Sequence, residues 1–354
     1  MDVDATQPTA GRPVSPGRPG RRRRGSLAAI FASLALILTG CGLQPATSFV
    51  PAAGPGSIEE IPSADGETIT VTSKNFTEQL ILGKIAVLAM QAAGFDVKDL
   101  TNVPGSQPVR ELMLSGQADV TWEYTGTAWL TYLGKKQGIP DQQKQYKAVR
   151  KADKKNGLTW LPPAPLNNTY AMAVRSEAVD DLGGISKLSE IKDLPVKERT
   201  FCVESEFNSR SDGLNPMLKH YGMKRGSPQG VPNDNIGIYD TGAVYSATDN
   251  GACNFGEVFT TDGRIEALDL TVLEDDKHFF PAYNGAAVVR TEVLKEFPQI
   301  ADVFAQISPE LTSDVMRKLN GKVDVQGMQP AQVAFDWMVK EGFISEADGV
   351  LGSQ

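Results

Sequence analysis

Side chains that could carry out covalent or metal chemistry are scarce in this 354-residue sequence. It contains two histidines, His220 and His278, and neither stands among carboxylates in a pattern that suggests a metal site. No G-x-S-x-G or S-x-x-K motif marks a nucleophile, and no glycine-rich segment followed by lysine marks a phosphate loop. The motifs therefore indicate no catalytic residue, no metal and no cofactor. Composition alone leaves a binding protein and a hydrolase open.

The three cysteines can be assigned chemistry from their surroundings. Cys41 ends the sequence Leu38-Thr39-Gly40-Cys41, which is similar to a bacterial lipoprotein box, where the thiol is lipidated and the preceding signal is removed. Cys202 and Cys253 fit no zinc or redox spacing such as C-x-x-C. Because an exported domain folds under oxidising conditions, we expect a disulfide between these two, with two separate buried thiols as the alternative.

The first 40 residues have the pattern of an export signal. Residues 1–24 are rich in Pro, Gly and Arg and end in four arginines, and residues 27–39 form an uncharged, mainly apolar run. That run is shorter than the ~20 residues that a spanning helix needs. We therefore predict a signal peptide over 1–40, and a lipidated Cys41 that begins a flexible tether, 41–67, rich in Pro, Ala, Gly and Ser. A buried apolar helix ending at Gly40 is the alternative.

Charge and composition narrow the class of protein. With 41% hydrophobic and 22% charged residues the chain is typical of a soluble globular protein, and its length predicts roughly two domains. The net charge is −8, and it becomes −12 without residues 1–40, which hold six Arg and two Asp. So acidic a body lacks the basic surface that binds nucleic acid or anionic lipid. We expect attachment to the outer face of the cytoplasmic membrane through the lipid alone.

Strands and helices alternate from residue 68 onward. Residues 69–73 alternate apolar and polar like a strand, Asn75 with Glu78 three positions later is typical of a helix start, and apolar residues at helical spacing run until Gly94. A second strand is predicted near 94–100, then a turn at Pro104-Gly105, a helix through residues 109–114 and a strand over 118–122. This alternation predicts an α/β fold with mostly parallel sheets.

A second block of the same kind follows the proline-rich residues 162–165. Its predicted strands lie at 170–174, 200–203 and 257–260. Segment 265–285 contains the largely apolar residues 268–273, and a helix-rich end runs to residue 354. If 165–172 and 265–285 are crossovers, the chain leaves its first domain and later returns to it. We therefore predict a discontinuous first domain, 68–165 and 276–354, and a second domain, 166–275. Two such crossings leave a cleft with a hinge, where ligands commonly bind.

Six ordered motifs from residue 72 to residue 283 give the sequence a family resemblance. They are Thr72-Ser-Lys-Asn-Phe-Thr-Glu-Gln-Leu-Ile-Leu-Gly, Glu123-Tyr-Thr-Gly-Thr, Asn168-Thr-Tyr, Ser205-Glu-Phe-Asn-Ser-Arg-Ser-Asp-Gly, Thr260-Thr-Asp-Gly-Arg-Ile and Asp275-Asp-Lys-His-Phe-Phe-Pro-Ala-Tyr. With these motifs the chain resembles the substrate-binding lipoproteins of glycine betaine/choline osmoprotectant ABC transporters. The resemblance implies a two-domain, cleft-type (type II) solute-binding fold, no enzymatic activity, and a separate permease and ATPase as partners.

The resemblance also implies a binding site. A quaternary ammonium would lie in an aromatic box of Tyr124, Tyr170, Phe259 and Tyr283, where position 259 is usually Tyr in relatives. A trimethylammonium cannot donate a hydrogen bond, and each ring face attracts it by about 0.5–2 kcal/mol, so several rings are needed. Asn168 also contributes to this implied site. Some relatives carry an acidic residue at this position, so we expect the preferred ligand to differ between members of the family.

The implied contacts to a ligand carboxylate come from Lys74, Thr127 and Arg210. Lys74 could instead lie on the solvated surface, and Arg210 could pair with Asp212 or Glu206. With these contacts a betaine-like zwitterion is expected to bind better than choline, which ends in a neutral hydroxyl. A protein for another cationic or zwitterionic solute, such as choline, carnitine or an amino acid, remains an alternative, as does an exported hydrolase.

Overall fold

The structure is a computed structural model, and it describes residues 50–139 and 141–346. All of these belong to one compact unit, Leu43–Gln354. The predicted signal peptide and Cys41 lie outside the described residues. Within the part of the chain that the structure describes, no helix is long and apolar enough to cross a membrane. In the same residues no group of three or more His, Cys, Asp and Glu side chains could hold a metal ion.

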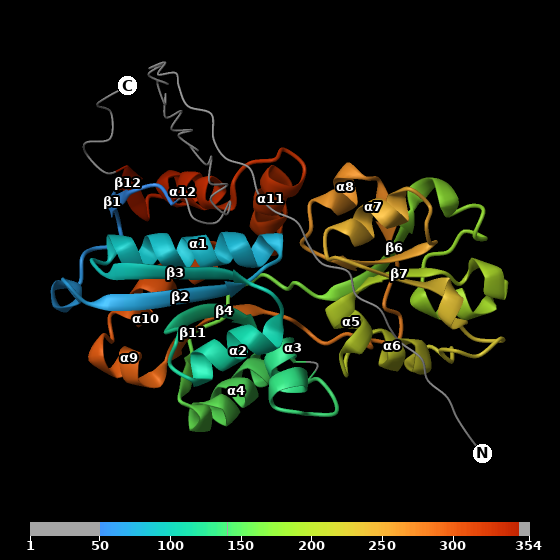
Figure 1. The fold of residues 1–354 in the computed structure, drawn as a ribbon, viewed down its shortest axis with the longest axis horizontal. Helices are drawn as coiled ribbons and strands as arrows, with labels where there is room; N and C mark the ends of the chain where they lie inside the picture. Colours follow the sequence, from blue (N-terminus) through green and yellow to red (C-terminus); the bar gives the residue numbers. More distant parts are fainter. Residues whose placement is uncertain (1–49, 140, 347–354) are drawn as a thin grey trace, which may run out of the picture. The chain divides into compact units, whose positions relative to one another are not determined.

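The first lobe is built on a five-stranded sheet with the order β3-β2-β4-β11-β5. Its strands are β2 (Thr68–Lys74), β3 (Asp96–Val103), β4 (Val120–Tyr124), β5 (Leu158–Trp160) and β11 (Gly285–Arg290). Its longer helices are α1 (Thr77–Ala92), α2 (Ser106–Leu114), α4 (Gln142–Asp153), α10 (Ile300–Ile307), α11 (Ser313–Asp324) and α12 (Pro330–Lys340). Helix α1 is buried on nearly every side because it lies between the sheet and the pair α11 and α12 (Figure 1).

The second lobe is built on another five-stranded sheet, with the order β10-β6-β9-β7-β8. Its strands are β6 (Tyr170–Arg175), β7 (Phe201–Glu204), β8 (Ile236–Tyr239), β9 (Phe255–Phe259) and β10 (Leu270–Val272), and its helices include α5 (Ser205–Ser209), α6 (Leu214–His220), α7 (Ala243–Asp249) and α8 (Arg264–Ala267). In this lobe Cys202 and Cys253 form a disulfide, with Cα atoms 5.7 Å apart. Closing that loop stabilises the fold by about 4 kcal/mol in the loop-entropy model.

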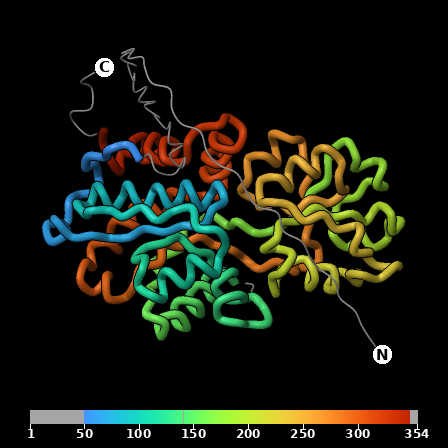
Figure 2. The backbone as a smooth tube through the Cα atoms, in the orientation of Figure 1, coloured from blue at the N-terminus to red at the C-terminus, as the bar shows by residue number. Residues whose placement is uncertain are grey.

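Two connections join the lobes, one between β5 and β6 and the other between β10 and β11. They run next to each other, because Asn167 in the first and Asn284 in the second form an antiparallel bridge. Figure 2 follows both connections, in green and in orange, from one sheet to the other. The membership of the two sheets supports the domain boundaries that we infer from the sequence, 68–165 with 276–354 and 166–275, and these boundaries remain our proposal.

The prediction of mostly parallel sheets is only half right. Strand β2 pairs in parallel with β3 and β4, and β7 pairs in parallel with β8 and β9. The strand that follows each connection is antiparallel to its neighbours: β6 to β9 and β10, and β11 to β4 and β5. Parallel neighbours within one sheet are usually joined by a crossover that contains a helix. A strand that enters from the other lobe is not joined by such a crossover, so it can pair antiparallel to its neighbours.

The predicted tether is wrong for its second half. Residues Ala53–Pro55 form β1, which pairs with β12 (Ile344–Glu346), and Ile58, Ile61 and Ala64 are buried in the core of the first lobe. The composition suggested flexibility, but Ile58 and Ile61 supply apolar surface that the lobe buries. Gly56 is required by close packing, since a Cβ there would lie 2.7 Å from the Gly342 carbonyl oxygen.

The predicted start of the first long helix also needs correction. Helix α1 begins at Thr77 with Phe76 at its N-cap position, and no side chain caps it, so Asn75 does not play that role. Glu78 does not complete a capping box either. Its side chain is buried and bonds to groups of both lobes and of the first connection. The helix is held in place by its buried surface rather than by a cap.

Candidate functional site

A cavity of about 510 Å³ lies between the two sheets and is lined by both lobes. All eight residues that the sequence suggested as ligand contacts line it: Lys74, Tyr124, Thr127, Asn168, Tyr170, Arg210, Phe259 and Tyr283. They come from strand ends, from the turns after them, and from the two connections. Lys74, Tyr124 and Phe259, for example, are the last residues of β2, β4 and β9.

Five aromatic rings form what we call the aromatic wall: Phe76, Tyr124, Tyr170, Phe259 and Tyr283. The Tyr170 ring centroid lies 5.3 Å from that of Phe259 and 5.6 Å from that of Tyr283. Phe76 lies between Tyr124 and Phe259, because its ring centroid is 5.2 Å from that of Phe259 and 6.2 Å from that of Tyr124. Since β4 and β9 belong to different lobes, the wall is complete only when the lobes meet.

The hydroxyls of the wall are turned to protein acceptors. Tyr124 donates to Glu78 over 2.7 Å, and Tyr283 donates to Asp212 over 2.7 Å. Burial raises the pKa of the Tyr124, Tyr170 and Tyr283 phenols well above the ordinary value, so they are neutral at physiological pH. The wall therefore offers uncharged rings, and two of its three hydroxyls, those of Tyr124 and Tyr283, already have protein acceptors.

The two cations that line the cavity are paired with carboxylates of the protein. Lys74 is buried, pairs with Glu123 and lies 4.9 Å from the centre of the Tyr124 ring, so it is not on the solvated surface. Arg210 binds Asp212 through two bonds of 2.7 and 2.6 Å and Glu206 through one of 2.9 Å. Arg210 thus makes the pairing with Asp212 and Glu206 that the sequence suggested as an alternative, and it also lines the cavity, so its contact with a ligand carboxylate stays a prediction.

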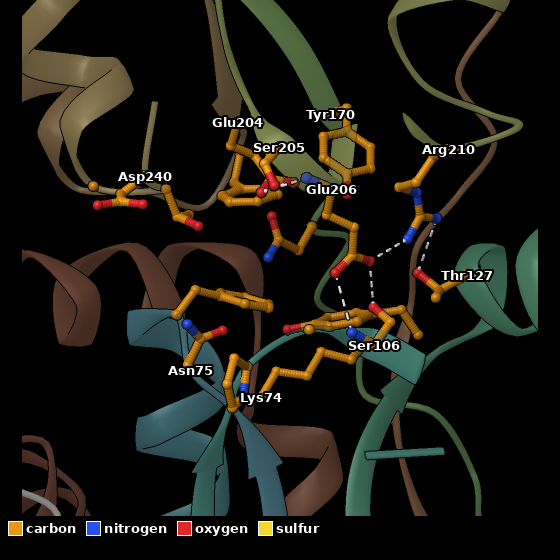
Figure 3. Close-up of a pocket in the computed structure, with 18 of the residues that line it drawn as sticks. Lys74, Asn75, Ser106, Thr127, Tyr170, Glu204, Ser205, Glu206, Arg210 and Asp240 are labelled. Carbon is orange, nitrogen blue, oxygen red and sulfur yellow. Dashed lines mark hydrogen bonds and ion pairs between the residues drawn. The ribbon is translucent and has the colours of Figure 1, made fainter. Parts of the chain in front are cut away.

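A charged bridge, which we define as Ser106, Thr127, Glu206 and Arg210, connects the lobes across the cavity (Figure 3). The Glu206 carboxylate accepts from the Ser106 backbone N–H over 3.0 Å and from its hydroxyl over 2.5 Å. Arg210 reaches the Thr127 hydroxyl at 3.5 Å. The lining holds three acids, Glu204, Glu206 and Asp240, against the two bases, so its net charge is negative.

Glu204 and Glu257 add to the acidic character of the second lobe beside the cavity. Glu204 caps α5 by accepting from the Phe207 and Glu206 backbone N–H groups, and its own N–H donates to Glu257 over 2.8 Å. Burial raises the pKa of the Glu257 carboxyl well above the ordinary value, and the nearby Glu204 raises it further. Burial also raises the pKa of Glu204. Burial therefore favours the neutral forms of these two carboxyls, and a cation bound nearby would favour their ionised forms, whereas a further anion would not.

Sequence reasoning missed several lining residues, among them Phe76, Ser106, Glu204, Glu206 and Asp240. Phe76 and Glu206 stand inside the motifs that carried the family resemblance, so a closer reading of those motifs could have found them. Asp240 follows β8 with no local signal. A second cavity, of about 920 Å³, is lined by Asp212 and by both histidines, His220 and His278.

The sequence of this chain is similar to those of known glycine betaine-binding proteins. The family model for the substrate-binding domain of the ABC-type glycine betaine transport system matches residues 67–340. The chain is 36% identical over 299 residues to the glycine-betaine-binding protein of Pseudomonas aeruginosa, covering 82% of this chain and 94% of that protein. It is 29% identical to a glycine betaine-binding protein of Escherichia coli, covering 80% of this chain and 93% of that one.

A solved structure of a similar protein has the same fold. The crystal structure of a glycine betaine/carnitine/choline ABC transporter protein matches with a TM-score of 0.63 and 25% identity, over 78% of this chain and 99% of that one. The predicted fold, that of a two-domain α/β solute-binding protein of type II, is confirmed, and the family consists of binding components of transporters, not of enzymes. The chain belongs to the family of substrate-binding domains of ABC-type glycine betaine transport systems.

Proposed function

We propose that this protein captures glycine betaine or a related quaternary ammonium solute outside the cytoplasm, holds it against the aromatic wall, and delivers it to an ABC permease driven by its ATPase. The observation that carries the proposal is one cavity that is lined by the five rings of the aromatic wall, from both lobes, and whose lining has a net negative charge. Ring faces attract a trimethylammonium without hydrogen bonds, and surrounding acids add a favourable potential.

The mode of capture follows from where the rings and the charged bridge lie. Tyr124 belongs to the first lobe and Phe259 to the second, while Glu206 and Ser106 bond across the gap. A ligand that touches both lobes binds the closed arrangement better than an open one, so binding shifts the population toward closure. The permease would then receive a closed, loaded protein.

Choline is a second candidate ligand, favoured by one observation. Lys74 and Arg210, the cations expected to meet a ligand carboxylate, are already paired with Glu123, Asp212 and Glu206. A zwitterion must compete with these protein acids for the cations, whereas a cation without a carboxylate need not.

A thermal-shift panel tests the proposal. Glycine betaine, choline, carnitine and proline betaine are compared with glycine and proline, which lack quaternary nitrogen. Ligand at 100 times its Kd adds about 2.7 kcal/mol to the free energy of unfolding, which is easily measured. We expect stabilisation by at least one quaternary compound and by neither amino acid. Equal stabilisation by glycine, or by none of the six compounds, would contradict the proposal.

Attachment to the membrane through a lipid on Cys41 is part of the same proposal. It is supported by the leader sequence, a basic segment followed by a short apolar run and Leu38-Thr39-Gly40-Cys41. Expression of Cys41→Ser beside the unaltered chain tests it. We expect the unaltered chain in the membrane fraction with the mass of a diacylated protein, and the variant in the soluble exported fraction. Membrane association that survives Cys41→Ser would rule the lipid anchor out.

A further inference from the structure

The buried carboxylate of Glu78 is placed directly behind the aromatic wall. Glu78 is 2% exposed, and its carboxylate accepts four hydrogen bonds. One oxygen accepts from the Tyr124 hydroxyl over 2.7 Å and from the Asn168 amide over 2.9 Å. The other accepts from the Thr261 hydroxyl over 2.5 Å and from the Asn320 amide over 3.3 Å. Two donors to each oxygen is the pattern of an ionised carboxylate.

All four donors to Glu78 are neutral groups, so they solvate its charge without neutralising it. Burial raises the pKa of this carboxyl, and the four hydrogen bonds oppose that rise. A buried anion without a cationic donor stabilises a positive charge placed nearby, because the surrounding protein screens it poorly. Two of its donors, Tyr124 and Asn168, line the cavity, so the carboxylate lies only one hydrogen bond away from the cavity lining.

Tyr124 provides the connection between the carboxylate and a bound cation. Its ring lines the cavity, and its hydroxyl donates to Glu78. A phenol that donates to a carboxylate holds more electron density in its ring than a free phenol, and the attraction of a ring for a cation grows with that density. The same hydrogen bond fixes the orientation of the ring.

The contacts of Glu78 also depend on the closed arrangement of the lobes. Glu78 lies in the first turn of α1 in the first lobe, whereas Thr261 follows β9 in the second. Asn320 of α11 donates to Glu78 and also to the Thr261 carbonyl, over 2.9 Å. Close backbone packing marks the same boundary, since a Cβ on Gly263 would lie 2.6 Å from the Gly321 Cα. Closure therefore completes the set of donors around the carboxylate.

We propose that Glu78 is a positioning residue that selects for positive charge in the ligand, acting through the hydroxyl of Tyr124 without touching the ligand. This inference rests on the proposed function, because it names how the same cavity prefers a cationic head group. A purely structural role for the buried carboxylate would instead affect every ligand of the same shape equally. The charge of the ligand is thus the variable that separates the two.

The experiment uses pairs of ligands that differ only in whether the head group is N⁺ or C. Choline is paired with 3,3-dimethylbutan-1-ol, and glycine betaine with 3,3-dimethylbutanoate. For the unaltered protein and for Glu78→Gln, the Kd of each quaternary compound is measured by calorimetry, and that of its carbon isostere by competition. Gln keeps the size of the side chain and one acceptor oxygen but removes the charge.

We expect Glu78→Gln to weaken the quaternary compound about tenfold or more and its isostere less than about threefold. Thr261→Val is the matched control, because it removes a donor to Glu78 and keeps the charge, so the preference for N⁺ over C should persist. Equal weakening of both members of a pair in Glu78→Gln would overturn the inference. If the unaltered protein binds no quaternary compound, the proposed function itself fails, which is a different result.

Tyr124→Phe keeps the inference testable if Glu78→Gln does not fold. This variant keeps the ring and removes only the hydroxyl that donates to Glu78. We expect Tyr124→Phe alone to lose part of the preference for N⁺ over C. If Glu78→Gln does fold, the two losses should not add when both changes are combined. A full preference in Tyr124→Phe would show that Tyr124 does not transmit the charge and would overturn the inference.

Discussion

The aromatic wall and the charged bridge line the same cavity but satisfy their polar groups differently. In the wall, the Tyr124 and Tyr283 hydroxyls donate to Glu78 and Asp212, while their rings line the cavity. In the bridge, Glu206 and Arg210 bond to each other and to groups of the first lobe. The wall is therefore suited to a ligand that needs no hydrogen bond, while the bridge holds the lobes together. Within one cleft, we therefore expect different residues to contact the ligand and to hold the two lobes together.

The pair of Lys74 and Glu123 beside the wall gives the largest expected effect. Both side chains are 4% exposed, so Lys74→Met leaves Glu123 buried and without its cation, which should lower the free energy of unfolding by about 3–5 kcal/mol. Loss of this positive charge should also weaken glycine betaine relative to choline. Denaturant unfolding and calorimetry measure the two effects.

The double variant Lys74→Met with Glu123→Gln is the control for this prediction. It removes both charges, so it should recover most of the lost stability. If Lys74→Met alone is as stable as the unaltered protein, the pair is not buried as described. If it weakens both ligands equally, Lys74 does not distinguish a carboxylate.

Removal of the central ring of the wall should have the next largest effect. Tyr170 contacts both Phe259 and Tyr283, so Tyr170→Ala should weaken the quaternary ligand by about 2 kcal/mol, or roughly thirtyfold in Kd. Trp129→Ala, outside the cavity, is the matched control and should leave Kd unchanged. Unchanged affinity in Tyr170→Ala, with the fold intact by circular dichroism, would remove the aromatic wall from recognition.

Glu206→Gln tests the charged bridge with a smaller expected effect. The variant removes one negative charge from the lining and loosens the hold on Arg210, which is then freer to meet a ligand carboxylate. The affinity for glycine betaine should rise relative to that for choline by about fivefold, near 1 kcal/mol. Glu177→Gln, whose side chain is 83% exposed on the same lobe, should not change this ratio. A ratio that moves toward choline in Glu206→Gln would contradict the role of the bridge.

Phe259→Tyr should have the smallest effect. The change keeps the ring that lies 5.2 Å from Phe76 and 5.3 Å from Tyr170, and it adds a hydroxyl at a half-buried position. Affinity should change by less than about 0.5 kcal/mol. A loss comparable to that in Tyr170→Ala would mean that the wall has no room for the hydroxyl that relatives usually carry here.

The sequence predicted the fold class and most strand positions because its apolar residues follow strand and helix periods clearly. Periodicity did not give the direction of β6 and β11, which depends on how each connection enters its sheet. The packing of residues 53–67 against the first lobe was not predicted, because two buried isoleucines are a weak signal among Pro, Gly and Ser. In both cases tertiary contacts, not local propensity, decided the structure.

Prediction of the site followed a similar division. The eight residues suggested by the family motifs line one cavity, because motifs mark positions that the fold brings together. The partners of Lys74 and Arg210 could not be predicted with the same certainty, since a cation beside several acids has more than one possible pairing. Glu78 was placed at a helix start by its spacing, whereas its burial depends on Thr261 and Asn320, far away in the sequence.

A crystal structure of the protein with glycine betaine or choline bound would test the central claim most directly. We expect the quaternary nitrogen within about 6 Å of the centroids of at least three rings of the aromatic wall, with the lobes closed around it. A ligand in the second cavity beside His220 and His278, or one held in the first cavity by the charged bridge with its methyl groups away from the rings, would contradict it.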